Sequence, residues 1–435
     1  MNILILGAGL AGISLARYLQ EYKEVSSIDI IEKDDAIGGL CRSIHKDGYT
    51  YDIGPHILFS KDKEMLNLML DVLPEKNDLK RSNQIIYKGR YVQYPFENDL
   101  SKLPKDDLNY CLASFLNNPY KSYKPQNMLQ FFLKTFGEGI TNIYLRPYNE
   151  KIWKFDPSFM DTQMVERIPQ PMDEEILRSA NGETVDGYVH QLYFHFPKHG
   201  GIESVVRGFE EKLHDKCKIH LNEEVFKITK KDTLFSVETP TKIHKGNLLI
   251  STIPVQELAK AYQGIPEEVS NHIKDLKYNS ILIAFIKTRE DLSGDNFAFM
   301  NPENDIIFHR ISKMDFLGDA YRSDSATYMV EVTYRQGDYI SGLPEKVLKE
   351  RIADGVCRIG FSRSAEDVKF INITKHPYAY VIYDLNHKEN MTAVRSFFDN
   401  EGVYLHGRFG NFEYWNMDKV LRESKNLSER IELCL

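Results

Sequence analysis

The stretch that most constrains the fold is Met1–Gly39, at the start of the 435-residue chain. An apolar run, Ile3–Leu6, is followed at once by the turn Gly7-Ala8-Gly9-Leu10-Ala11-Gly12 and by an amphipathic segment with helical spacing. A second apolar run, Ile28–Ile31, ends in Glu32. This order predicts a strand, a glycine turn, a helix, a second strand and an acid, which together form the dinucleotide-binding fingerprint.

Each position of the glycine turn has a physical role in such a site. Gly7 permits the tight turn, Gly9 lets a pyrophosphate approach the backbone, and Gly12 lets the helix pack close to the strand. The free N–H groups at the helix N-terminus, at Leu10 and Ala11, offer partial positive charge to phosphates. A glycine turn that binds nothing is the competing interpretation, and the complete strand–turn–helix–strand context argues against it.

The choice between NAD and FAD depends on the residues after Glu32, whose carboxylate would accept hydrogen bonds from a ribose diol. The pair Gly38-Gly39 favours FAD, because a second glycine turn there resembles that of the glutathione-reductase-like and amine-oxidase-like flavoproteins. We therefore expect FAD over the first βαβ unit. Its isoalloxazine ring would lie near Gly54-Pro55-His56, which interrupts a predicted strand.

Composition and charge exclude several classes of protein. No apolar run approaches the roughly 20 residues of a membrane span, and the N-terminal run is too short for a secretory signal. The formal charge of −8 argues against nucleic acid as the main partner. The five cysteines are scattered and form no CxxC, which suits a reducing compartment and gives no metal pattern. We expect a cytoplasmic protein without a metal site, and homo-oligomers remain possible.

The order of predicted elements indicates an α/β fold with discontinuous domains. The run Leu248–Pro254 fits a buried parallel strand that rejoins the first sheet, and Gly402–Leu435 predicts a last strand and helix. Turns at Lys46-Asp47-Gly48 and Lys88-Gly89 predict two hairpins. We expect a Rossmann-like FAD-binding domain at 1–75, 196–262 and 400–435, a helical insertion at 98–162, and an antiparallel-sheet substrate domain at 76–97, 163–195 and 263–399.

Five stretches spread over the whole chain together resemble the UDP-galactopyranose mutase family. They are Gly38-Gly39 with Tyr51–Ile57; Tyr144–Trp153 with Pro157 and Glu166–Pro169; Phe196–Gly201; Phe308–Arg310; and Gly407–Gly410 with Tyr414 and Asp418. The N-terminal fingerprint is shared by the whole flavoprotein superfamily, whereas the blocks Trp153–Arg167 and Arg408–Tyr414 discriminate within it. The chain has Asn416 where the family usually has an acid.

The resemblance implies a reaction without net redox change. Reduced FAD would attack the anomeric carbon of a UDP-sugar, UDP-galactose in the family, through flavin nitrogen 5 and expel UDP. The flavin–sugar adduct would then open and reclose, which interconverts the pyranose and furanose forms. The protein would orient the reactants and stabilise charge. NADPH or NADH is a possible reductant of the flavin.

The resemblance also implies roles for individual residues. Arg167 and Arg310 would bind the departing diphosphate, because a planar guanidinium binds phosphate oxygens bidentately. His56 would lie beside the flavin, and Trp153 would stack on uracil or close over the site. The predicted catalytic residues are His56, Arg167 and Arg310; the predicted cofactor-binding residues are Gly7, Gly9, Leu10, Ala11, Glu32, Lys33, Gly39, Leu40, His56, Val225, Arg408 and Asp418; the predicted substrate-binding residues are Trp153, Tyr148, Asn149, Arg167, Arg310, Tyr383 and Tyr414.

Two other functions fit part of the pattern. An FAD-dependent oxidoreductase of the amine-oxidase or protoporphyrinogen-oxidase kind shares the first domain and the C-terminal flavin helix. It would turn over with oxygen and would not need two diphosphate-binding arginines. A flavin-binding protein without chemistry is the third hypothesis, suggested by Asn416. The two arginines favour the mutase.

Overall fold

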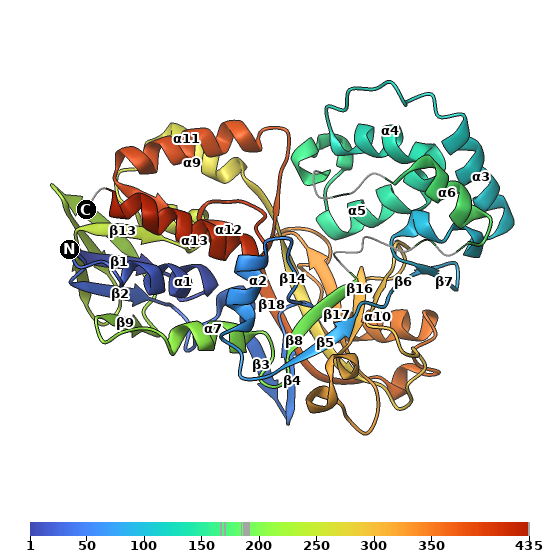
Figure 1. Cartoon of the computed structure of the whole chain (residues 1–435), viewed down its shortest axis with the longest axis horizontal. Helices are drawn as coiled ribbons and strands as arrows, with labels where there is room; N and C mark the ends of the chain where they lie inside the picture. The colour runs from blue at the N-terminus through green and yellow to red at the C-terminus, as the bar shows by residue number, and fades with distance from the viewer. Residues whose placement is uncertain (166–167, 169–170, 184, 186–191, 434–435) are drawn as a thin grey trace.

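The computed structural model describes residues 1–165, 168, 171–183, 185 and 192–433. The first strand and the last described helix lie on the same side of the molecule, where helices flank a parallel sheet (Figure 1). A unit of helices lies at the opposite side, and a long antiparallel sheet lies between the two (Figure 1). The predicted fold class, a Rossmann-like domain with an antiparallel sheet and a helical insertion, is confirmed.

The parallel sheet is assembled from three remote parts of the chain. Its strands, in spatial order, are β19 (Val403–Leu405), β13 (Leu248–Ser251), β1 (Asn2–Leu6), β2 (Ser27–Ile31) and β9 (Cys217–His220). All neighbouring strands run parallel, and Leu4 lies opposite both Leu249 and Asp29. The strand predicted near 248–254 does return to the first sheet, and it ends at Ser251.

Both faces of this sheet are covered, which explains why its strands are almost continuously apolar. Ile3 and Ile5 pack on one side, whereas Leu4 and Leu6 pack on the other. The Ile3 side carries α1 (Leu10–Leu19), α2 (Lys63–Leu70), α7 (Glu203–Glu210) and α13 (Met417–Glu432). The Leu4 side carries an antiparallel meander, β10 (Lys227–Lys231), β11 (Leu234–Glu238) and β12 (Ile243–Gly246), with α8 (Val255–Ala261), α9 (Glu267–Asp275) and α11 (His387–Asn400).

The second large sheet has seven strands and forms the middle of the molecule. In spatial order they are β18 (Lys369–Ile382), β14 (Lys277–Lys287), β17 (Thr327–Tyr334), β16 (Arg310–Lys313), β15 (Ala298–Met300), β6 (Asn83–Tyr87) and β7 (Arg90–Gln93). Neighbouring strands are antiparallel except β15 and β6, which run parallel. Helix α10 (Glu345–Arg358) packs on one face. The hairpin predicted at Lys88-Gly89 joins β6 to β7.

Two short antiparallel pairs connect the large sheets. The pair β3 (Ser43–Lys46) and β4 (Tyr49–Asp52) is the other predicted hairpin, and β5 (Lys76–Lys80) pairs with β8 (Tyr193–Pro197). Asp47 and Gly48 both have positive φ, 50° and 82°, which is the backbone that a tight two-residue hairpin turn requires.

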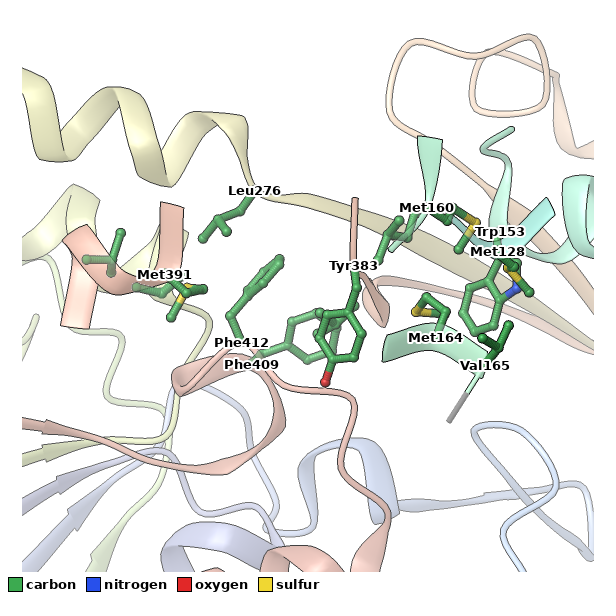
Figure 2. Close-up of a cluster of buried hydrophobic side chains, with 14 of the residues drawn as sticks. Met128, Trp153, Met160, Met164, Val165, Leu276, Tyr383, Met391, Phe409 and Phe412 are labelled. Atoms are coloured by element: carbon green, nitrogen blue, oxygen red, sulfur yellow. The ribbon is translucent and has the colours of Figure 1, made fainter. Parts of the chain in front are cut away.

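The helical unit consists of α3 (Lys105–Leu116), α4 (Met128–Ile140), a π-helical turn at Thr141–Leu145, α5 (Arg146–Trp153) and α6 (Asp173–Ala180). The Leu100 N–H donates a hydrogen bond to the Ser179 hydroxyl of α6 at 3.4 Å, so α6 packs beside the predicted insertion. The domain limits given above stay a prediction. Figure 2 shows the apolar cluster that joins this unit to the rest of the molecule, with Met128, Trp153, Met160, Met164, Val165, Leu276, Tyr383, Met391, Phe409 and Phe412.

One buried lysine anchors the helical unit on the seven-stranded sheet. The Nζ of Lys151 donates to the Asn301 carbonyl at 3.0 Å, the Asn301 Oδ1 at 3.2 Å and the Glu303 carbonyl at 2.8 Å. Thr333 of β17 donates in turn to the Lys151 carbonyl at 2.9 Å. Because these bonds cross between the two units, they fix the position of α5 relative to the sheet.

We expect Lys151→Met to destabilise the fold by about 2–4 kcal/mol, because it leaves buried carbonyl groups without donors. The free energy of unfolding from chemical denaturation measures this loss. Lys105→Met, on the exposed side of α3, is the matched control and is expected to stay within about 0.5 kcal/mol of the unchanged protein. Equal stability of the two variants would contradict the anchoring role.

Candidate functional site

A cavity of about 1460 Å³ is lined by residues of both large sheets and of the helical unit. This volume exceeds the roughly 300–1,000 Å³ typical of one drug-sized ligand. The cavity therefore has room for an extended dinucleotide and for a second ligand beside it.

Most of the residues predicted for the site line this cavity. The predicted residues on its wall are Gly7, Gly9, Leu10, Ala11, Glu32, Lys33, Gly39, Leu40, His56, Trp153, Val225, Arg310, Arg408, Tyr414 and Asp418. Tyr148, Asn149 and Tyr383 are described by the structure and are not among the wall residues. Arg167 lies outside the described residues, so its assignment stays a prediction.

Close backbone contacts shape the phosphate end of the cavity. A Cβ at Gly12 would lie 2.0 Å from the Gly7 carbonyl oxygen, so no side chain fits where α1 meets β1. A Cβ at Gly39 would lie 3.2 Å from the Gly9 Cα, which brings the two glycine turns into contact. Gly407 closes the third side, since its Cβ would lie 2.8 Å from the Ala11 Cβ.

The N-terminus of α1 presents uncapped N–H groups at this end of the cavity. Its N-cap residue is Gly9, which has no side chain to satisfy them. Glu32 lies nearby and is 8% exposed; its Oε2 accepts from the Ala8 N–H at 2.8 Å and its Oε1 from the Asp34 N–H at 3.0 Å. Each carboxylate oxygen keeps a lone pair for a second donor, such as a ribose hydroxyl.

A second helix, α13, begins at the cavity wall. Its N-cap residue is Asn416, which makes no side-chain capping hydrogen bond, and Asp418 follows in the first turn. Asp418 is not the cap: its Oδ2 accepts from the Ser60 hydroxyl at 2.5 Å. Asn416 at the cap is neutral, and the positive end of the α13 dipole is directed at the cavity. The carboxylate of Asp418 lies in the first turn, where its Oδ1 accepts from the Lys419 N–H at 2.8 Å.

Arg408 supplies a half-buried cation to the same wall. Its guanidinium carbon lies 4.4 Å from the centre of the Tyr414 ring and 5.8 Å from that of Tyr380, which is cation–π contact distance. The buried Nε of Arg408 has no hydrogen-bond partner among the described residues. A buried donor of this kind fits an acceptor atom on a bound ligand.

His56 lies in the wall beside Arg408 and is held by its own turn. Its Nδ1 lies 3.2 Å from the Gly54 carbonyl, which assigns the proton to Nδ1 and leaves Nε2 as an acceptor. Burial lowers the pKa of His56 to about 4, and the charges of Arg408 and Arg310 act in the same direction. The imidazole is therefore neutral at pH 7.

Arg310 is paired within the protein. Its Nε donates to the Glu331 Oε1 at 2.5 Å and its Nη2 to the Oε2 at 2.7 Å, across the neighbouring strands β16 and β17. Burial disfavours the charge of Arg310, but Glu331 outweighs burial and raises the pKa of the guanidinium. Glu331 is 0% exposed, so it orients Arg310 rigidly toward the cavity. The remaining nitrogen, Nη1, is the group of Arg310 that can bind an anion.

Arg81 is a cation near the site that the sequence pattern does not single out. Its guanidinium carbon lies 5.0 Å from the ring centre of Phe59, a wall residue. The Nε of Arg81 is buried and has no hydrogen-bond partner among the described residues. Burial lowers the pKa of Arg81, and Arg310 adds to this effect, so the two positive charges are close. Arg81 lies between two strands and belongs to no motif, so the sequence alone does not indicate that it stacks on an aromatic ring near the site.

The three predicted substrate residues behind the wall are used in internal bonds or packing. Asn149 Oδ1 accepts from the Trp153 Nε1 at 2.8 Å and its Nδ2 donates to the Leu145 carbonyl at 2.7 Å, so Asn149 fixes the indole ring. The Tyr383 hydroxyl donates to Glu413 Oε2 at 2.6 Å and accepts from the Tyr414 N–H at 2.7 Å. Tyr148 stacks on Tyr144. Their roles as direct substrate ligands stay predictions.

The fold and the site define a dinucleotide-binding protein: a parallel sheet with a glycine cradle, an acid beside it and a second ligand space beyond. A family model described as flavin containing amine oxidoreductase matches residues 10–387, and the chain belongs to this family. The family implies FAD. Three features of the site fit this cofactor: the uncapped N-terminus of α1, the spare lone pairs of Glu32, and the Nε of Arg408, which has no partner among the described residues.

The chain is also similar to UDP-galactopyranose mutases. It is 25% identical over 175 residues to a probable mutase of Klebsiella pneumoniae, which covers 39% of this chain and 45% of the relative. It is 25% identical over 234 residues to a mutase of Mycoplasma genitalium, 51% of this chain and 55% of the relative. The matches thus span about half the length of these curated relatives. A crystal structure of reduced UDP-galactopyranose mutase matches with a TM-score of 0.89 at 23% identity, covering 100% of this chain and 96% of that chain. At this identity the structural likeness supports the fold.

We expect Gly9→Val to abolish flavin binding, because the added methyl groups would occupy the space that a pyrophosphate needs at the α1 N-terminus. The flavin absorbance of the purified protein measures the outcome. Gly342→Ala is the matched control, since a Cβ at Gly342 meets no atom within 4 Å. Full flavin occupancy in the Gly9 variant would contradict the placement of the cofactor.

A second test uses the pKa of His56, which is about 4 in the folded protein. The unfolded chain, with a pKa near 6.5, binds more protons between these values, so stability is lost as pH falls from about 6.5 to 4. The contribution is at most about 3–4 kcal/mol. We expect His56→Gln to make the unfolding free energy less dependent on pH in this window. Identical pH profiles for the variant and the unchanged protein would show that His56 is not buried and neutral.

Proposed function

We propose that the protein interconverts the pyranose and furanose forms of a UDP-sugar, with UDP-galactose as the first candidate. The observation that carries the proposal is the juxtaposition of Arg310 and Arg81 near the wall residues His56 and Arg408. A departing diphosphate needs cations at its oxygens, and guanidinium groups are the side chains best suited to it. The curated relatives that match part of the chain support the same reaction.

In this proposal, some residues of the chain act on the cofactor and others bind the substrate. When bound, reduced FAD supplies a nucleophilic ring nitrogen and undergoes no net oxidation. The α13 N-terminus, with neutral Asn416, favours the anionic reduced form of the flavin. His56, neutral with Nε2 as an acceptor, can accept a hydrogen bond near the ring. Its low pKa keeps a third positive charge away from Arg408 and Arg310 at pH 7.

Binding of the diphosphate falls to the arginines. Arg310 offers Nη1 while Glu331 holds its other nitrogens, and Arg81 offers Nε. Arg167 completes the proposed set as the residue predicted from the sequence. Trp153, fixed by Asn149 and in edge contact with Tyr414, provides an apolar surface for the uracil ring.

We also propose that the protein works in the cytoplasm with a flavin reduced by NADPH or NADH. The four described cysteines, at 41, 111, 217 and 357, are all free thiols, which suits a reducing compartment. Among the helices that the structure describes, none has both the length and the apolar character needed to cross a membrane. A nucleotide sugar is the proposed small-molecule partner, and a homo-oligomer remains an expectation from the sequence.

Product analysis separates the mutase from the oxidoreductase alternative. UDP-galactopyranose incubated with dithionite-reduced protein is expected to yield the furanose isomer, resolved by chromatography, with no oxygen consumed. Oxidised protein is expected to be inactive. Oxygen-dependent turnover of an amine or another reduced substrate, with no sugar isomer formed, would overturn the mutase proposal in favour of an oxidase.

The arginines give a sharper test at the level of binding. A charge-assisted contact contributes about 1.5–3 kcal/mol, so Arg81→Met and Arg310→Lys are each expected to raise the Kd for UDP at least about tenfold. Flavin absorbance should stay unchanged in both. Arg289→Met, whose side chain is 78% exposed, is the matched control and should bind UDP normally. Unchanged UDP affinity in both site variants would remove the arginines from the diphosphate site.

Arg167→Ala tests the assignment made from sequence alone. We expect UDP binding to weaken severely while the flavin remains bound, because the phosphate contact is lost without disturbing the glycine cradle. Calorimetric titration with UDP measures the first effect and the visible spectrum the second. Retained UDP affinity would exclude Arg167 from the substrate site.

A further inference from the structure

Three potential metal ligands meet between the parallel sheet and the meander, outside the cavity wall. Asp29 lies on β2, His220 at the end of β9 and His244 on β12, and their donor atoms all lie within 4.8 Å of one another. Asp29 and His220 share the Leu4 side of the sheet, because Asp29 pairs with Leu4 and His220 pairs with Ile31. The meander packs on that side and brings His244 against the ring of His220, with the ring centres 4.7 Å apart.

Hydrogen bonds within the protein account for two of the three side chains. His220 Nε2 lies 2.6 Å from the Asp29 Oδ1, and the Lys242 Nζ donates to the His220 Nδ1 at 3.0 Å. His244 is different: it is 6% exposed, and its Nε2 is buried with no hydrogen-bond partner among the described residues. Such an unsatisfied buried group costs about 1–3 kcal/mol, so its retention needs a physical reason.

We propose that Asp29, His220 and His244 bind one divalent transition-metal ion, with zinc the best match to the donor set. Two imidazoles and one carboxylate suit zinc and similar ions, whereas magnesium and calcium prefer oxygen ligands. Zinc–ligand distances of about 2.0–2.2 Å place two donors on one ion at most about 4.4 Å apart, so a small rotation of one side chain completes the site. The ion gives His244 Nε2 the partner that it lacks.

The surroundings of the site favour a neutral histidine and a bound cation. Burial lowers the pKa of His244, and the nearby His220 and Lys242 act in the same direction. Glu223 lies near His244, accepts a hydrogen bond from the Thr241 hydroxyl and adds negative charge. Lys242 is exposed, and its ammonium group donates a hydrogen bond to the Nδ1 of His220. Its positive charge therefore disfavours a metal ion at this site.

Such an ion would tie β12 of the meander to β2 and β9 of the sheet. The cysteine pattern predicts no metal site, and the three ligands stand at positions 29, 220 and 244 with no spacing motif between them. Only the packing of the meander on the sheet brings them together. The proposal is independent of the proposed function, because none of the three residues belongs to the cavity wall.

Zinc binding to the complete, flavin-loaded chain tests the proposal, with any affinity tag removed and bound metal stripped by chelator. We expect one zinc per chain by elemental analysis and calorimetry. We also expect a rise in Tm that EDTA reverses and that magnesium does not reproduce. No zinc bound to the unchanged protein overturns the proposal.

Variants locate the ion. His244→Gln and Asp29→Asn are each expected to weaken zinc binding at least about tenfold, with flavin absorbance confirming that the chain is folded. His199→Gln, at an exposed histidine, is the control and should bind zinc normally. Lys242→Met should bind zinc more tightly, a gain that misfolding does not produce. Equal zinc affinity in the His244, Asp29 and unchanged proteins, or weaker binding in the Lys242 variant, overturns the assignment.

Discussion

The site depends on a close approach of three backbone turns around the first residues of α1. Gly12 lies against the Gly7 carbonyl, Gly39 against Gly9, and Gly407 against Ala11, each at a distance where a side chain would collide or crowd. This contact places the uncapped N–H groups of α1 at the cavity wall. It also fixes the position of Glu32 at the end of β2. The same contact fixes the position of Arg408, which follows Gly407. It therefore also limits where a flavin ring and a second ligand can bind.

Electrostatics then divide the three arginines of the proposed site, Arg81, Arg310 and Arg408, into two kinds. The charge of Arg310 is neutralised by Glu331, a fully buried partner. Such a buried ion pair contributes more to the orientation of the guanidinium group than to the stability of the fold. Arg81 and Arg408 instead keep their charge over aromatic rings, and each has a buried Nε without a partner among the described residues. His56 is held neutral, and fixed positive charge lies close to it on Arg408 and Arg310, an arrangement suited to an anionic ligand.

Local patterns predicted much of this architecture. A few neighbouring residues are enough to predict each of three features: the strand–turn–helix start, the hairpins at Asp47-Gly48 and Lys88-Gly89, and the return strand at Leu248–Ser251. The sequence could not predict how side chains are used across distant segments. The Arg310–Glu331 pair depends on the register of β16 and β17, and Arg81 depends on stacking with Phe59.

The discontinuous parallel sheet has a consequence for how the chain is made. Strand β1 is synthesised well before two other strands of this sheet: its neighbour β13 follows about two hundred and forty residues later, and β19 later still. Pairing across such separations carries a large loop-closure cost and slows folding. The parallel sheet is therefore complete only after β19 has been synthesised. Until β13 has been made, one apolar edge of β1 stays unpaired, and chaperones can bind the nascent chain there.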